Sequence, residues 1–156
     1  MQKIAPCLWF DGRAEEAARF YIGVFGNSRI TTTLHHTEAS PGDPGDVLAI
    51  TFELDGQEFV ALNGGPNFTF SPAISLFVHC GSQEEIDTYW ARLAEGGQLW
   101  QCGWLQDRFG VSWQIVPDVL SEMLRDPDRA KANRAMQAMM NMVKLDIAQL
   151  EAAFRG

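Results

Sequence analysis

The sequence predicts an α+β protein made of two tandem β-α-β-β-β modules followed by C-terminal helices. Three observations support this prediction: an internal repeat, strand-like runs around one amphipathic helix in each half, and a change to helix-forming composition after Pro117. A chain of 156 residues suits one domain or two small modules, and a hydrophobic fraction of 46% is ample for a packed interior.

The internal repeat relates DGRAEEAARFY (11–21) to CGSQEEIDTYW (80–90) without a gap. Such a repeat indicates two copies of one supersecondary unit. A second alignment places Gly56 on Gly110 and Phe59 on Trp113, and it supports the same pairing of the two halves.

The first module contains the five expected elements in order. Apolar residues recur at helical spacing from Ala14 to Phe25, and the Asp55-Gly56 step is typical of a hairpin turn. A loop or lid rich in Pro, Gly and acid is expected over 38–46. The strand-like runs are 4–10, 29–36, 47–55 and 57–63.

The second module repeats this order in a shorter form. A strand-like run over 73–79 precedes a helix that starts with the capping box Ser82-x-x-Glu85 and ends at Gly96-Gly97. Three short strand-like runs follow, LWQCGW, LQDRF and VSWQIV. We expect one domain over 1–117, built from modules 1–65 and 72–117, and a helical extension over 118–156.

Charge and composition argue against two classes of partner. The chain has 12 basic and 20 acidic residues, a formal net charge of −8, whereas nucleic acids and anionic membranes attract clustered basic residues. No apolar run approaches the roughly 20 residues of a membrane span. We therefore expect no nucleic-acid partner and no membrane partner.

The three cysteines, Cys7, Cys80 and Cys102, are far apart and lack CxxC spacing. An odd number without such spacing is typical of reduced thiols, so we expect a cytoplasmic protein. Neither Cys80 nor Cys102 has a well-placed neighbouring base, and burial as small hydrophobic residues is the favoured interpretation.

Four segments of the chain resemble a known family: PCLWFDGRAEEAARFY, FELDGQEFVALNGGP, AISLFV and QCGWLQDRFGVSWQIVP. They are similar to the PhnB-like subgroup of the vicinal oxygen chelate superfamily, often labelled as a 3-demethylubiquinone-9 3-methyltransferase domain. The resemblance implies a curved mixed sheet that forms a cup, a frequent homodimer, and a divalent metal bound by residues of the first and last strands of each module.

The resemblance also allows the metal positions to be tested one by one. They fall on Pro6, Ser75, Val60 and Gln114, of which Pro6 and Val60 offer no side-chain donor and Gln114 alone is a plausible ligand. We therefore predict neither a metal site nor a cofactor. The methyltransferase label is disfavoured too, because no glycine-rich turn leads from a buried strand into a helix.

Strand alternation predicts which residues line the cup. The expected lining is largely apolar with a few convergent polar groups, as in many small-molecule sites. No catalytic residue is assigned. The predicted ligand-binding residues are Gln114, Ser75, His79, Phe77, Leu8 and Phe10, with Glu58 and Asn63 as further oxygen donors.

Three functions remain open at this point. The leading hypothesis is a metal-independent protein that binds a small, partly hydrophobic molecule, such as an aromatic or quinone-like compound. The alternatives are a metal-dependent lyase or dioxygenase with an atypical site of Gln114, Glu58 and an unidentified histidine, and a dimeric scaffold for another protein. A stoichiometric bound metal would favour the enzyme, and a filled, solvent-free cup would contradict the ligand-binding hypothesis.

Overall fold

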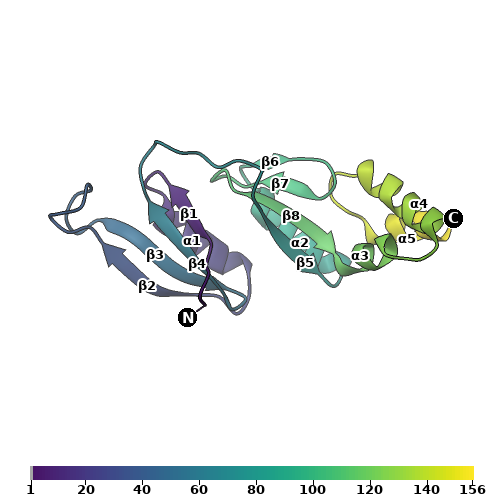
Figure 1. Cartoon of the computed structure of the whole chain (residues 1–156), viewed down its shortest axis with the longest axis horizontal. Coiled ribbons are helices and arrows are strands. Elements are labelled where there is room, and N and C mark those ends of the chain that lie inside the picture. The colour runs from purple at the N-terminus through teal and green to yellow at the C-terminus, as the bar shows by residue number, and fades with distance from the viewer. Residues whose placement is uncertain (1) are drawn as a thin grey trace. The chain divides into compact units, whose positions relative to one another are not determined.

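The computed structural model describes residues 2–156, which form two compact units with their boundary between Phe70 and Ser71. Each unit holds one four-stranded mixed sheet with a helix packed on one face (Figure 1). The predicted α+β class and the tandem modules with C-terminal helices are confirmed, and each sheet is open.

The first unit forms a sheet in the order β1-β4-β3-β2. Strand β1 runs parallel to β4, and the other neighbours are antiparallel. This pattern follows from the chain order, because α1 makes the crossover that two parallel strands require. The elements are β1 (Cys7–Phe10), α1 (Ala14–Val24), β2 (Arg29–His35), β3 (Val47–Leu54) and β4 (Gln57–Asn63).

Helix α1 packs its small residues against one face of this sheet. Ala14, Ala17 and Ala18 are fully buried, so the helix backbone lies close to the strands. Tyr21 stacks on Phe52, with ring centroids 6.4 Å apart. Burial of a large side chain such as that of Phe52 contributes roughly 1.5–3 kcal/mol, which makes this face the core of the unit.

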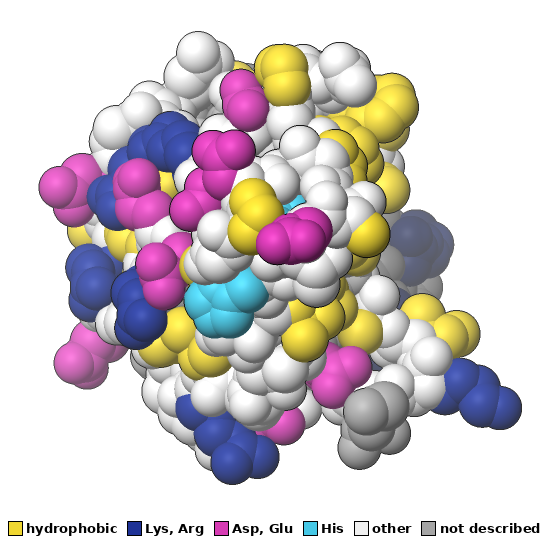
Figure 2. Space-filling model, turned by 90° about the vertical axis from the view of Figure 1, so that its left-hand side faces the viewer, with side chains coloured by type: hydrophobic (Ala, Val, Ile, Leu, Met, Phe, Trp, Pro, Cys, Tyr) yellow, Lys and Arg dark blue, Asp and Glu magenta, His cyan; other side chains and the backbone are white. Residues whose placement is uncertain are grey.

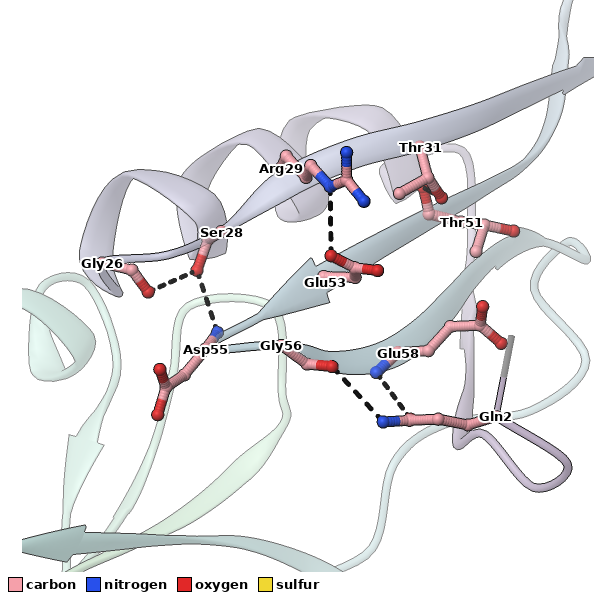
Figure 3. A network of polar contacts seen from close by, with 10 residues as sticks. All are labelled: Gln2, Gly26, Ser28, Arg29, Thr31, Thr51, Glu53, Asp55, Gly56 and Glu58. Atoms are coloured by element: carbon pink, nitrogen blue, oxygen red, sulfur yellow. Dashed lines mark hydrogen bonds and ion pairs between the residues drawn. The ribbon is translucent and has the colours of Figure 1, made fainter.

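The hairpin between β3 and β4 has the predicted two-residue turn. Asp55 and Gly56 have φ angles of 48° and 80°, and positive φ at both central residues is what a type I′ turn requires. Figure 3 shows how neighbouring residues hold this hairpin. Ser28 Oγ accepts from Asp55 N at 3.2 Å, and Gln2 Oε1 accepts from Glu58 N at 2.9 Å.

The expected 38–46 loop, between β2 and β3, is held by the backbone and the ring of His36. His36 N donates to Asp46 O at 2.8 Å, and Gly45 N donates to His36 O at 3.1 Å. The His36 ring contacts Ser40 Oγ through Nδ1 at 3.0 Å. Gly42 lies against that ring, where a Cβ atom would clash with it. The loop is therefore a structured hairpin connection.

The second unit repeats the sheet order as β5-β8-β7-β6, with β5 parallel to β8. Helix α2 starts at the predicted N-cap, because Ser82 Oγ accepts from Glu85 N at 3.2 Å. The Glu85 carboxylate reaches back as in a capping box, but it accepts from Gly81 N, at 3.0 Å, and not from Ser82 N. The elements are β5 (Ser75–Cys80), α2 (Gln83–Ala94), β6 (Gln98–Leu99), β7 (Trp104–Gln106) and β8 (Ser112–Pro117).

The C-terminal helices belong to this second unit. They are α3 (Asp118–Leu124), α4 (Arg129–Met140) and α5 (Ile147–Arg155), and they enclose a core that includes Leu120, Leu145 and Leu150. Gln83 of α2 joins them to the module, because its amide bonds Leu145 O at 3.1 Å and Ile147 N at 2.8 Å. None of the helices in residues 2–156 has the length and apolarity to cross a bilayer.

Candidate functional site

Strand pairing in the second unit brings the predicted polar residues onto one face. In β5 and β8, Ser75 lies beside Ser112, Phe77 beside Gln114, and His79 beside Val116. Paired residues of neighbouring strands point to the same side of a sheet. The alternating residues Trp113 and Ile115 are buried in the core, whereas Ser75 and Gln114 are only half-buried.

Two predicted residues of this face are in direct contact. Gln114 Nε2 donates a hydrogen bond to Ser75 Oγ at 2.9 Å. Both side chains are half-buried, so the bond is partly protected from water. Ser112, next to them in the sheet, is 1% exposed, and its Oγ has no hydrogen-bond partner among residues 2–156. A buried hydroxyl without a partner is a group that a ligand or a water could satisfy.

Phe77 and His79 extend the face toward the end of β5. Phe77 is 45% exposed, and its ring centroid lies 4.8 Å from that of His79. His79 Nδ1 contacts Asp118 Oδ1 at 3.3 Å. Asp118 is the first residue of α3, so the C-terminal helices supply the partner of this histidine. Sequence analysis did not identify Asp118, since its contact with His79 is not local in sequence.

The predicted lining residues of the first strand lie on the opposite face from the one expected. Leu8 pairs with Ala61 and Phe10 with Asn63, while Cys7 pairs with Val60 and Trp9 with Leu62. Leu8 and Phe10 are 7% and 4% exposed in the core beneath α1. The assignment of Leu8 and Phe10 to the face of Val60 is therefore corrected, and Cys7 and Trp9 take their place.

Trp9 fixes the segment that follows the first sheet. Its Nε1 donates to Gly65 O at 2.9 Å, and its ring meets Phe68 edge to face with centroids 5.0 Å apart. Gly64 lies so close to the indole that a Cβ atom would clash. This part of the 64–72 connection thus packs on the first unit.

Asn63 is occupied by structural hydrogen bonds. Its Oδ1 accepts from Ala14 N at 2.9 Å and its Nδ2 donates to Val47 O at 3.0 Å, so the amide caps α1 and joins it to β3. Glu58 lies on the face of Val60, beside Glu53 of the neighbouring strand, and its carboxylate extends away from the Gln2 contact (Figure 3). Neither residue lies in the second unit with Gln114.

Asp107 has a structural role rather than a catalytic one. It is 2% exposed and accepts from Phe109 N at 2.8 Å, Val111 N at 3.0 Å and Trp113 Nε1 at 2.8 Å. The neighbouring Arg108 lies over the Phe109 ring. The segment from Asp107 to Val111 is therefore a turn held by the aspartate.

The first unit also has a pocket of about 360 Å³ beside the start of α1. Figure 2 looks at the end where the β2–β3 loop lies and shows histidine and acidic side chains among hydrophobic ones. The sequence predicted the acidic loop, but it did not predict that the loop lines one pocket together with the start of α1. The lining residues are Gly12, Glu15, His36, Gly42, Asp43, Asp46, Val47 and Asn63.

The thiol nearest to His79 is poorly suited to nucleophilic chemistry. Cys80 is fully buried, and burial, with smaller contributions from the charges of Glu85 and Asp118, raises its pKa to about 12. The reactive form of cysteine is the thiolate. Cys80 is therefore a protonated core residue at neutral pH.

The donor groups on the Gln114 face do not fit the divalent metal centre that the fold would suggest. An amide and a hydroxyl that bond each other, with one exposed histidine, offer few anionic or nitrogen ligands. Within residues 2–156, no group of three or more His, Cys, Asp or Glu side chains is placed to hold a metal ion.

The fold and this face can be compared with known proteins. No curated protein matches the chain. Among solved structures, a PhnB protein from Bacillus cereus is 42% identical, with a TM-score of 0.68, over 74% of this chain and 99% of that chain. The fosfomycin resistance protein FosX from Listeria monocytogenes, solved with Mn(II) and sulfate, shares the fold at 15% identity and a TM-score of 0.54, over 80% of this chain and 98% of that chain.

The family assignment comes from the sequence itself. The family model described as 3-demethylubiquinone-9 3-methyltransferase matches residues 2–116, which cover both sheets and end within β8. The three C-terminal helices lie beyond this match. The chain therefore belongs to the 3-demethylubiquinone-9 3-methyltransferase-like, or PhnB-like, family with a glyoxalase-superfamily fold.

Proposed function

We propose that the chain binds a small, partly hydrophobic molecule on the face of Gln114 without a divalent metal. The observation that carries this proposal is the Gln114–Ser75 hydrogen bond beside the exposed ring of Phe77. A few polar groups among apolar side chains are the usual composition of small-molecule sites.

The remaining hydrogen-bonding capacity of the face indicates what it would recognise. In its bond to Ser75, Gln114 uses one N–H group, while its carbonyl Oε1 can accept a further bond. Ser112 Oγ is buried without a partner among the described residues. A flat apolar body on Phe77 could carry a hydroxyl that donates to Gln114 Oε1, or a carbonyl that accepts from the second N–H of Gln114 Nε2, as a phenol or a quinone-like compound does.

The experiment is a binding screen in the presence of EDTA with a panel of phenols, aromatic acids and quinols, followed by calorimetry. We expect saturable binding that the chelator leaves unchanged. Gln114→Leu keeps the side-chain volume but removes the amide, so it should weaken binding about tenfold. Gln98→Leu is the matched control, because Gln98 is an exposed glutamine on the edge strand β6.

Two results would contradict the proposal. One is binding that appears only after addition of Zn²⁺, Ni²⁺, Fe²⁺ or Mn²⁺ and that EDTA abolishes, which would favour the metal-dependent enzyme. The other is equal affinity of wild type and Gln114→Leu while both unfold at the same temperature.

We also propose that the protein acts as a homodimer in the cytoplasm. All three cysteines are free thiols, as a reducing compartment would leave them. Ile4 and Ile74, just before the first strand of each unit, are 83% and 79% exposed, and an assembly would bury such apolar side chains. Light scattering at micromolar concentration should give twice the mass of one chain, and a monomer would contradict this.

A further inference from the structure

Two soft sulfur donors meet at the surface of the second unit, and neither belongs to the predicted ligand-binding residues. The thiol of Cys102, in the β6–β7 loop, contacts the thioether of Met140, the last residue of α4, with Sγ and Sδ 3.8 Å apart. Met140 is 58% exposed and Cys102 is half-buried, so the pair is accessible from solvent.

The backbone holds this pair in place. Cys102 N donates to Met142 O at 2.8 Å, and Gly103 N donates to Val143 O at 2.8 Å, which fixes the loop to the chain after α4. Cys102 itself has a φ of 62°. A left-handed backbone is costly for most residues and is favoured by Gly or Asn. Cys102 thus occupies a backbone position that glycine or asparagine would adopt with less strain.

The distance between the two sulfurs suits one shared metal ion. If both lie about 2.3 Å from an ion, as sulfur ligands of metals do, a separation of 3.8 Å corresponds to an angle of about 110° at the metal. That angle lies near those of tetrahedral and trigonal coordination, so the observed spacing of the two sulfurs is compatible with one shared ion.

Met136 offers a third sulfur on the same side of α4. It precedes Met140 by one helical turn, is 39% exposed, and side chains at this spacing lie on one helix face. The methionine side chain has three rotatable bonds and adapts readily. Met139 and Met142, by contrast, pack against the core of the C-terminal helices.

We propose that Cys102, Met140 and Met136 form a binding site for a soft monovalent metal ion, Cu(I) or Ag(I). Thiolate and thioether sulfurs are soft ligands that suit Cu(I), whereas Mg²⁺ prefers oxygen ligands. On binding, the Cys102 thiol releases its proton to solvent and its sulfur forms a bond to the metal, with no change of oxidation state. The family match ends at residue 116, so the helices beyond it supply both methionines.

The test titrates the full chain with Cu(I), kept reduced by ascorbate and competed by bicinchoninate, and in parallel with Ag(I). We expect one ion per chain. Met140→Leu conserves the side-chain volume and should weaken binding at least about tenfold, while Met136→Leu should weaken it less. Cys7→Ser removes an exposed cysteine of the first unit and should change nothing.

Cys102→Asn gives the sharpest outcome. Asparagine tolerates the left-handed backbone, so this variant should unfold at the wild-type temperature or above it and yet lose the ion. Retained binding in Cys102→Asn would overturn the proposal. So would Met140→Leu with wild-type affinity, which would reduce the site to an isolated thiol, or a wild type without stoichiometric Cu(I) or Ag(I).

Discussion

The two sheets have the same strand order, yet they hold their corresponding hairpins by different means. In the first unit, β3 and β4 are joined by the two-residue turn Asp55-Gly56, with positive φ at both positions. In the second unit, three residues separate Asp107 from Val111, and Asp107 accepts hydrogen bonds from that loop. The register places Asp107 where the first unit has Leu54.

This difference shows what a longer loop requires. In a two-residue turn, the backbone N–H and C=O groups form hydrogen bonds within the hairpin ladder and need no side-chain acceptor. The neighbouring Leu54 can therefore be an apolar core residue. The longer loop leaves backbone N–H groups turned inward, and a buried carboxylate is needed to accept them. Trp113 Nε1 uses the second oxygen of Asp107, so one acid satisfies the loop and the indole.

The largest effect we expect follows from this comparison. Asp107→Leu gives the second unit the residue of the first, but leaves three donors without the acceptor, and we expect a loss of about 3 kcal/mol or more of unfolding free energy. Urea denaturation followed by tryptophan fluorescence measures it.

The matched control for that change is in the first unit. Glu53→Gln alters an exposed ion pair with Arg29, at 3.1 Å, and should cost less than about 1 kcal/mol. If Asp107→Leu cost no more than Glu53→Gln, the loop would not depend on its aspartate.

The helix starts show a second difference between the units. Ser82 caps α2 from the adjacent position in the chain, whereas α1 receives its cap from Asn63 at the far end of β4. Asn63→Ala removes bonds to both Ala14 N and Val47 O, so we expect a loss of about 2 kcal/mol. Ser82→Ala should lose about 1 kcal/mol. Thermal unfolding of the two variants compares them directly.

Asn63→Asp separates the two bonds of the amide. An aspartate still accepts from Ala14 N and, as an anion, favours the helix start, but it cannot donate to Val47 O. An intermediate stability is therefore expected. A variant as stable as wild type would show that the link to β3 contributes nothing.

Much of the fold and part of the candidate site could be predicted from the sequence. The repeat revealed both modules, and alternation in β5 and β8 correctly placed Ser75, Phe77, His79 and Gln114 on one face. These strands are continuous, and their buried partners, such as Trp113, are strongly apolar. Local pattern was sufficient there.

The first strand shows why the same method failed elsewhere. Cys7 pairs with Val60 as Phe77 pairs with Gln114, so Cys7 and Phe77 are equivalent positions of β1 and β5. The sequence offset between these two strands is therefore one residue larger than the offset between α1 and α2. The extra residue lies between β1 and α1. An alignment anchored on the helices therefore shifted β1 by one position, and such a shift exchanges the two faces of a strand. Leu8 and Phe10 were misplaced for this reason.

The smallest effect we expect concerns Cys80, which occupies the position of Phe10 in the first unit. Burial first, then the charges of Glu85 and Asp118, raises its pKa from 9.0 to about 12, so the folded state keeps a proton that the unfolded chain releases. The stability due to this group is complete below pH 9.0 and is lost as the pH rises toward 12. Phe10 has no such dependence.

Cys80→Ala tests this directly, because it removes the titrating group and leaves a small apolar residue. Its unfolding free energy should fall less steeply than that of wild type between pH 9 and pH 11, although its value at pH 7 is lower because of the lost packing. Equal slopes would mean that the thiol titrates alike in the folded and unfolded states. The second unit would then differ from the first in its hairpin and its helix start, but not in the response of its core to pH.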